Sequence, residues 1–104
     1  MPIINENDTV SVEEIKLGDN DNLAAMISLL MDADLLISLS DIDGLFTKDP
    51  RKHADAQLIP VVAAITKGTE KAAGSIPGPL GTGGMMSKLA AARKANSAGV
   101  PMVI

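Results

Sequence analysis

The sequence has 104 residues, enough for at most one domain, and its 46% hydrophobic and 21% charged residues are typical of a globular chain. A formal net charge of −4 without a run of Lys or Arg argues against a nucleic-acid partner, and no apolar stretch approaches the ~20 residues of a membrane span. The absence of cysteine excludes a disulfide framework and a cysteine-based zinc site, and it fits a cytosolic, cytoplasmic protein.

The first residues, Pro2-Ile3-Ile4, resemble the tail of a strand, and an amphipathic helix is predicted after them, from about Asp21 to Met31. Asp19 and Asn20 precede this helix as N-cap candidates. Apolar residues recur at i, i+3, i+4 and i+7 and form one stripe: Leu23, Met26, Ile27 and Leu30.

The apolar run Leu35–Leu39 suits a buried parallel strand that ends before a turn at Asp43-Gly44. The polar segment Thr47–Gln57 is predicted to be a surface loop, and it contains His53, the only histidine, as a solvated side chain. Leu58–Ile65 could be a further strand with its exit.

The segment Lys67–Gly84 is rich in Gly and Pro and is predicted to be a long loop with a brief helical turn. A second helix is predicted from about Met85 to Ser97, with Gly99 at its C′ position and a final strand at Val100–Ile104. Four residues of this helix share one face: Met85, Leu89, Ala92 and Asn96. Strands that alternate with helices predict an α/β layer fold with a mainly parallel sheet.

Both ends of the sequence, Pro2-Ile3-Ile4 and Val100–Ile104, are predicted to be strands. Native chains rarely begin and end inside strands, so we expect these residues to be a section of a longer polypeptide. The strands are apolar on both faces, as central strands are. We therefore expect this section alone to associate with itself through uncovered faces and edges. As a separate expectation, the whole protein is a homo-oligomer.

Three polar clusters lie where ligands of open α/β sheets bind, beyond strands or at a helix start. They are Asn5-Glu6-Asn7-Asp8, Gly18-Asp19-Asn20-Asp21-Asn22 and Ser40-Asp41. Each also has an ordinary structural explanation: turn chemistry, helix capping and a strand-to-turn junction, respectively. No cluster is diagnostic by itself.

The glycine-rich segment from Leu80 to Lys88 is a stronger signal. Small residues let successive backbone N–H groups face an anion, and the helix that follows adds its positive N-terminus. Lys88 falls in the first turn of that helix, within reach of a phosphate. The segment matches neither a Walker loop nor a dinucleotide-binding fingerprint, and a plain helix-entry loop remains the alternative.

Taken together and in this order, these clusters resemble glutamate 5-kinases, which belong to the amino acid kinase superfamily. The resemblance also includes Gly44-Leu45-Phe46-Thr47 and Asp49-Pro50-Arg51, and it covers nearly all 104 residues. It implies part of a three-layer αβα fold. It also implies ATP-dependent phosphorylation of the side-chain carboxylate of L-glutamate, the first step of proline biosynthesis, with ATP and Mg²⁺ and without a metal site made by the protein.

The resemblance implies roles residue by residue. Lys88 matches the lysine that steadies the transferring phosphoryl group, and Asp21 matches the aspartate that orients catalytic lysines. Asp8 and Asn20 match residues that hold glutamate, with Asn5 nearby. The nucleotide-binding residues would be Ser40, Asp41, Thr82, Gly83, Gly84, Met85, Met86, Ser87 and Lys88, with Ser40 at a position where the family often has Thr.

The family's N-terminal lysine strand and its C-terminal PUA domain have no counterpart in these residues. Residues 1–104 would thus be the central and C-terminal portion of an amino acid kinase domain, and we expect them to be inactive in isolation. Two alternatives stay open. One is another amino acid kinase that acts on acetylglutamate, aspartate or UMP, and the other is a non-catalytic ligand-binding module of the same fold.

Overall fold

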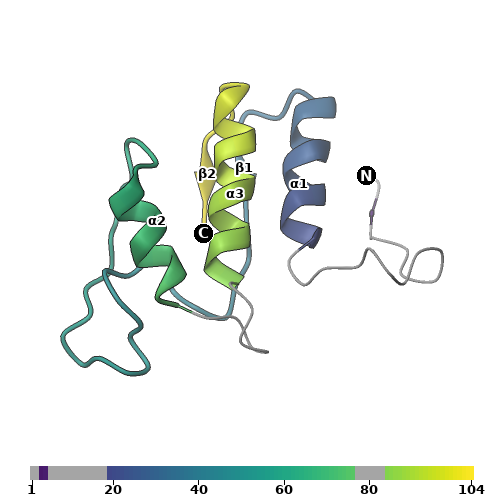
Figure 1. The fold of residues 1–104 in the computed structure, drawn as a ribbon. Coiled ribbons are helices and arrows are strands. Elements are labelled where there is room, and N and C mark those ends of the chain that lie inside the picture. The colour runs from purple at the N-terminus through teal and green to yellow at the C-terminus, as the bar shows by residue number, and fades with distance from the viewer. Residues whose placement is uncertain (1–2, 5–18, 77–83) are drawn as a thin grey trace.

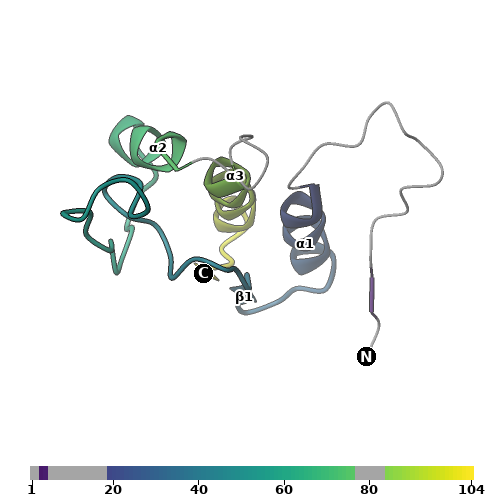
Figure 2. The same ribbon diagram turned by 90° about the horizontal axis from the view of Figure 1, so that it is seen from below.

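The computed structural model describes residues 3–4, 19–76 and 84–104. In chain order its elements are α1 (Asp19–Leu30), β1 (Leu36–Ile37), α2 (Lys67–Gly74), α3 (Gly84–Ser97) and β2 (Met102–Val103). The three helices form a row on one side of the two strands, with α3 between α1 and α2 (Figures 1 and 2).

The two strands are parallel, as the sequence predicts, with Leu36 opposite Met102 and Ile37 opposite Val103. The N–H of Ser38 donates to the carbonyl of Val103 at 2.8 Å and extends the pairing by one hydrogen bond. Both strands are shorter than predicted. Within the described ranges each strand has a single neighbour, and the pairing covers two residues of each.

Two predicted strands are wrong for this structure. Ile3 and Ile4 lie outside any strand, and their side chains are exposed, Ile3 at 93%. In the segment from Leu58 to Ile65 only Leu58 pairs, in an isolated antiparallel bridge with Phe46. An apolar run becomes a strand only where a neighbouring strand offers hydrogen bonds, which composition does not reveal.

Helix α2 is longer than the predicted brief turn. Its start is stabilised by a reciprocal capping box, in which the Thr66 side chain accepts from the N–H of Thr69 and the Thr69 side chain accepts from the N–H of Thr66. At its other end, Ala73 and Ile76 are buried in the main core cluster with Leu45, Met85 and Leu89. Burial at one end and a cap at the other make this eight-residue helix stable despite its two glycines.

Helix α1 differs from its prediction in both start and face. It begins at Asp19, so Asp19 and Asn20 are helical residues rather than N-caps. Its buried side chains are Ala25 and Ser28, and of the predicted apolar stripe Leu30 is 78% exposed. The reason is that α1 packs beside α3 (Figure 2), whose buried residues include Ala91 and Ala95. Small side chains allow two helices to approach closely.

Helix α3 confirms its prediction closely. It starts one residue earlier than expected and ends in a Schellman motif, in which the N–H of Gly99 donates to the Asn96 carbonyl and the N–H of Val100 donates to the Ala95 carbonyl. Gly99 has the left-handed φ of +82° that this motif requires. The chain then turns directly into β2, with Val100 buried beneath the helix end.

The loop from Thr47 to Gln57 is largely exposed, as predicted, but Asp49 within it is buried. The Asp49 carboxylate accepts hydrogen bonds from the backbone N–H of Arg51 at 3.0 Å and from its Nε at 3.2 Å. The backbone hydrogen bond is the main reason that the pKa of Asp49 lies below its ordinary value near 3.8, while burial acts in the opposite direction.

Candidate functional site

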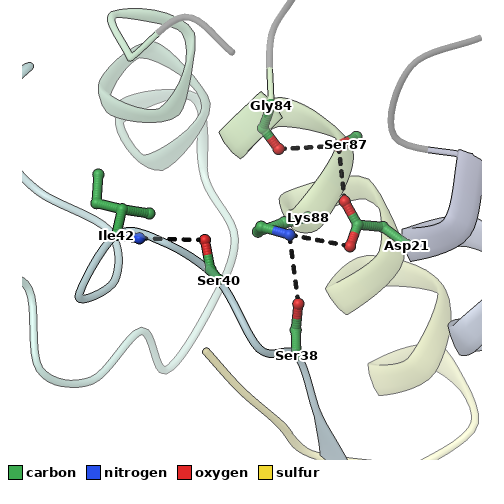
Figure 3. A network of polar contacts seen from close by, with 7 residues as sticks. All are labelled: Asp21, Ser38, Ser40, Ile42, Gly84, Ser87 and Lys88. Atoms are coloured by element: carbon green, nitrogen blue, oxygen red, sulfur yellow. Dashed lines mark hydrogen bonds and ion pairs between the residues drawn. The ribbon is translucent and has the colours of Figure 1, made fainter. Parts of the chain in front are cut away.

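Three elements meet at the side chain of Lys88 (Figure 3). Lys88 projects from the first turns of α3, and its Nζ lies 3.1 Å from Oδ1 of Asp21, in the first turn of α1. The same Nζ lies 3.4 Å from Oγ of Ser38, directly after β1. Residues separated by 50 and 67 positions in the chain are thereby joined at one ammonium group.

A serine completes this network on the other oxygen of Asp21. The Ser87 hydroxyl is 2.9 Å from Oδ2 of Asp21 and 2.8 Å from the Gly84 carbonyl. A hydroxyl has one hydrogen and both neighbours are acceptors, so Ser87 shares its hydrogen between them. The carboxylate is therefore held on both oxygens, by Lys88 and by Ser87.

The ion pair of Lys88 and Asp21 is partly buried, since each side chain is only 16% exposed. Partial burial weakens screening by water, so the pair is held more firmly than an exposed one. An ammonium has three N–H donors. Within the described residues Lys88 donates to Asp21 and Ser38, which leaves one donor available to a ligand at the N-terminal end of α3.

Helix N-termini favour anions because their first N–H groups are unpaired and the helix dipole is positive there. The ammonium of Lys88, the fifth residue of α3, adds a full positive charge near this helix end. The arrangement of α3, Lys88 and its two partners is thus suited to a phosphate group.

The sequence itself places the chain among known proteins. A family model described as the amino acid kinase family matches residues 1–104, the whole chain. The chain belongs to the amino acid kinase family.

Within the amino acid kinase family, several curated relatives of this chain are named glutamate 5-kinase. It is 58% identical over 104 residues to a protein named glutamate 5-kinase from Meiothermus ruber, and 56% identical to one of that name from Geobacter metallireducens, in each case across 100% of this chain and 28% of the relative. A glutamate 5-kinase from Clostridium tetani is 57% identical, and the match spans 39% of its length. The chain therefore spans between about a quarter and two-fifths of these relatives, and the resemblance to glutamate 5-kinases is confirmed.

Only some of the predicted site residues of this amino acid kinase chain come together in the structure. Lys88, Asp21 and Ser87 come together as one network. Asn20 is exposed beside Asp21 in the first turn of α1. Asn5, Asp8, Thr82 and Gly83 lie outside the described residues.

The predicted nucleotide-contacting pair, Ser40 and Asp41, comes after β1, as Ser38 does. Ser40 and Asp41 are both exposed, and the Ser40 hydroxyl accepts from the N–H of Ile42 at 3.4 Å (Figure 3). Ser40 lies two residues beyond Ser38, so one strand end carries both groups.

The described residues of the glycine-rich segment differ in how deeply they are buried. Gly84 begins α3 and is half-buried, and Met86 is 39% exposed. Met85 is only 3% exposed and packs in the core with Leu45 and Leu89. The side chain of Met85 therefore anchors the helix start, and only its backbone is available to a ligand.

One member of the network, Ser38, was not predicted. The signal available in the sequence is a single hydroxyl residue inside the apolar run Leu35–Leu39. Such a residue needs a hydrogen-bond partner when it is partly buried, but the identity of that partner depends on how α3 packs over the strand.

Among residues 3–4, 19–76 and 84–104, His, Cys, Asp and Glu side chains nowhere gather in a group of three or more that could hold a metal ion. In the same part of the chain no helix has the length and apolar character needed to cross a membrane.

Proposed function

We infer that the protein to which these residues belong transfers the γ-phosphoryl group of ATP to the side-chain carboxylate of L-glutamate. An oxygen of the carboxylate forms the new bond to phosphorus, the bond from phosphorus to ADP breaks, and the products are an acyl phosphate and ADP. The observation that carries the proposal is the Lys88 ammonium held at the N-terminal end of α3, in a chain with over 50% identity to glutamate 5-kinases.

Lys88 is assigned the stabilisation of the moving phosphoryl group. In phosphoryl transfer the protein mainly positions the reactants and stabilises negative charge on the phosphoryl oxygens. The available donor of Lys88 would contact one such oxygen. Asp21 is assigned the orientation of Lys88, because its carboxylate is 3.1 Å from the ammonium and is itself held by Ser87.

Glutamate recognition is assigned to three residues, Asn20, Asp8 and Asn5. Asn20 lies one residue before Asp21, so a substrate held by its side-chain amide would be near the ammonium of Lys88. The amides of Asn20 and Asn5 can donate to a substrate carboxylate, and the carboxylate of Asp8 can accept from the substrate's ammonium.

The nucleotide is assigned to the carboxyl end of β1 and the start of α3. Ser40 and Asp41 follow the strand, and the segment Thr82–Lys88 leads into the helix; its backbone N–H groups would face the phosphates. Mg²⁺ bound by the ATP phosphates would neutralise part of their charge, because Mg²⁺ at such sites takes most of its ligands from phosphate oxygens and water.

The same family assignment sets the wider context of the proposal. Residues 1–104 would form the central and C-terminal portion of an amino acid kinase domain in a cytoplasmic, homo-oligomeric enzyme. Its product would enter proline biosynthesis.

The test uses the full-length polypeptide that carries residues 1–104. With ATP and Mg²⁺, it should convert L-glutamate to an acyl phosphate, which hydroxylamine traps as a hydroxamate, and ADP should be released in equal amount. Aspartate, N-acetylglutamate and UMP serve as competing substrates. Turnover of one of these in place of glutamate would reassign the substrate, and no turnover of any of them would favour a non-catalytic module.

A further inference from the structure

We propose that Ser38 is a positioning residue for Lys88: its hydroxyl holds the lysine ammonium from the strand side and adds a second contact to the one made by Asp21. The proposal rests on the function inferred above for Lys88, and it concerns a residue to which neither the sequence motifs nor the comparisons give a role.

The orientation of Ser38 follows from the alternation of side chains along a strand. Leu36 and Ser38 are half-buried, whereas Ile37 and Leu39, between and after them, are 59% and 90% exposed. Leu36 and Ser38 therefore face the helices. Ser38 is the polar member of this pair, and its hydroxyl points at Lys88 (Figure 3).

The backbone of Ser38 is hydrogen-bonded to the neighbouring strand. Its N–H donates to the carbonyl of Val103 at 2.8 Å, which joins it to β2. Lys88 extends from a different element, α3, on a flexible four-carbon stem. A hydroxyl fixed to the strand pair can therefore restrict where that ammonium lies.

The contact geometry limits the size of the effect. At 3.4 Å the distance from Nζ to Oγ is longer than the usual 2.7–3.2 Å of such hydrogen bonds. The 3.1 Å contact with Asp21 is the stronger one. Asp21 alone, however, leaves the ammonium free to rotate about one ion pair, and the second contact defines where its remaining N–H points.

The consequence is a specific kinetic signature. Loss of the Ser38 hydroxyl should not disturb the residues assigned to glutamate, so KM for glutamate should stay within about twofold. It should lower kcat by about 3- to 10-fold, the effect of one hydrogen bond of ordinary net strength.

The experiment compares Ser38→Val with Ser38→Thr in the full-length polypeptide. Valine and threonine have nearly the same shape and both suit a strand, but only threonine keeps the hydroxyl. We expect Ser38→Thr to retain most of kcat and Ser38→Val to show the 3- to 10-fold loss. Equal kcat values for the two variants would overturn the proposal.

A second measurement does not depend on activity. Nuclear magnetic resonance of ¹⁵N-lysine-labelled protein reports the rate at which the Lys88 ammonium exchanges its hydrogens with water, which hydrogen bonds slow. Exchange should be faster in Ser38→Val than in Ser38→Thr, with the other lysines unchanged. If the exchange differs but no glutamate is phosphorylated, the contact is real and only the inferred function fails; if the exchange is the same, the positioning role is wrong.

Discussion

Asp21 and Lys88 each belong to a short sequence motif, and only the folded chain brings the two side chains into contact. In the sequence, Asp21 lies in a stretch of Asp and Asn residues that is ordinary for the start of a helix. A lysine near a helix start, such as Lys88, is equally ordinary. Their pairing across 67 positions distinguishes them from ordinary first-turn residues. Neighbouring Asn20 is exposed in the same turn of α1.

Replacement of Asn20 should separate the two substrates. Asn20→Ala in the full-length polypeptide should raise KM for glutamate by about tenfold or more, because it removes a hydrogen bond to a charged group, and should raise KM for ATP much less. Steady-state kinetics with each substrate varied in turn measures this. Asn96→Ala, an exposed asparagine in the last turn of α3, is the matched control. Equal increases of both KM values would show that Asn20 is not a glutamate residue.

Asp49 gives a prediction about pH. Its pKa is lowered in the folded state, so at low pH the unfolded state binds a proton more readily than the folded state does. The stabilisation is complete above its ordinary pKa near 3.8 and is lost as the pH falls through the lower, folded-state value. Asp49→Asn should therefore make the midpoint of thermal unfolding fall less steeply below pH 4 than in the unmodified protein, as differential scanning calorimetry can measure.

The comparison for this pH prediction is Asp55→Asn. The pKa of Asp55 is also lowered, mainly by its hydrogen bond with Lys48, but its side chain is 74% exposed. Solvent screens such a pair, so this variant should change the pH dependence little. If Asp49→Asn and Asp55→Asn change the pH dependence of the unfolding midpoint equally, burial of Asp49 does not explain the contribution of its carboxylate to stability.

At the scale of elements, local signals predicted helices better than strands. Helix α3 was predictable because a capping glycine, Gly99, marks its end within the sequence itself. Helix α2 was predicted only as a brief turn because its cap uses Thr at the third position, where Glu or Gln would be the recognised signal, and its segment contains two glycines. The strand lengths depend on neighbouring strands, and Leu35–Leu39 contains no information about how many it has.

The face that α1 buries shows the same limit. The apolar stripe predicted a core along Leu23, Met26, Ile27 and Leu30, but the helix turns Ala25 and Ser28 toward α3. A stripe of large apolar residues identifies a helix face that another element could bury. The neighbouring element, here α3, decides which face is actually buried. The site depends on this choice, since Asp21 lies on the α3 side of the same helix.

The end of α3 supplies an element-scale prediction. Gly99→Ala should lower stability by roughly 1–2 kcal/mol, because alanine disfavours the left-handed φ of +82°, although an added Cβ would meet no atom within 4 Å. The midpoint of thermal unfolding should fall by about 2–8 °C. Gly74→Ala is the control, since Gly74 also has open space around it but ends α2 without a positive φ, and alanine there should be neutral or stabilising. A similar loss in both variants would contradict the capping role of Gly99.

At the scale of the molecule, the side of β1 and β2 away from the helices is apolar and uncovered in the described structure. Ile37, Leu39 and Val103 are 59%, 90% and 50% exposed there. Contiguous apolar surface and open strand edges promote association. We therefore expect the isolated 104-residue chain to self-associate at ~10⁻⁵ M, a concentration at which exposed apolar surface and strand edges drive association.

Light scattering at that concentration checks the expectation. Ile37→Lys, which places a charge on the uncovered face, should shift the chain toward monomer. Val61→Lys is matched to it, because Val61 is 78% exposed in the segment before α2, and it should leave the association unchanged. A clean monomer without substitution would show that the uncovered face does not drive association. The isolated chain should also release no ADP in a glutamate-dependent manner, and detectable release would contradict our assignment of residues 1–104 as an incomplete kinase domain.

Helices α1 and α3 and strand β1 are joined at Lys88, so one side chain tests whether their assembly is the phosphoryl-transfer site. The measurement is kcat for glutamate-dependent ADP release by the full-length polypeptide with Lys88→Ala, compared with Lys48→Ala, whose lysine forms an exposed ion pair with Asp55. Loss of a charge-stabilising contact made in the transition state should lower kcat by about 10²–10³-fold for Lys88→Ala, while Lys48→Ala should stay within about twofold. An unchanged kcat in Lys88→Ala would contradict the assignment of this site.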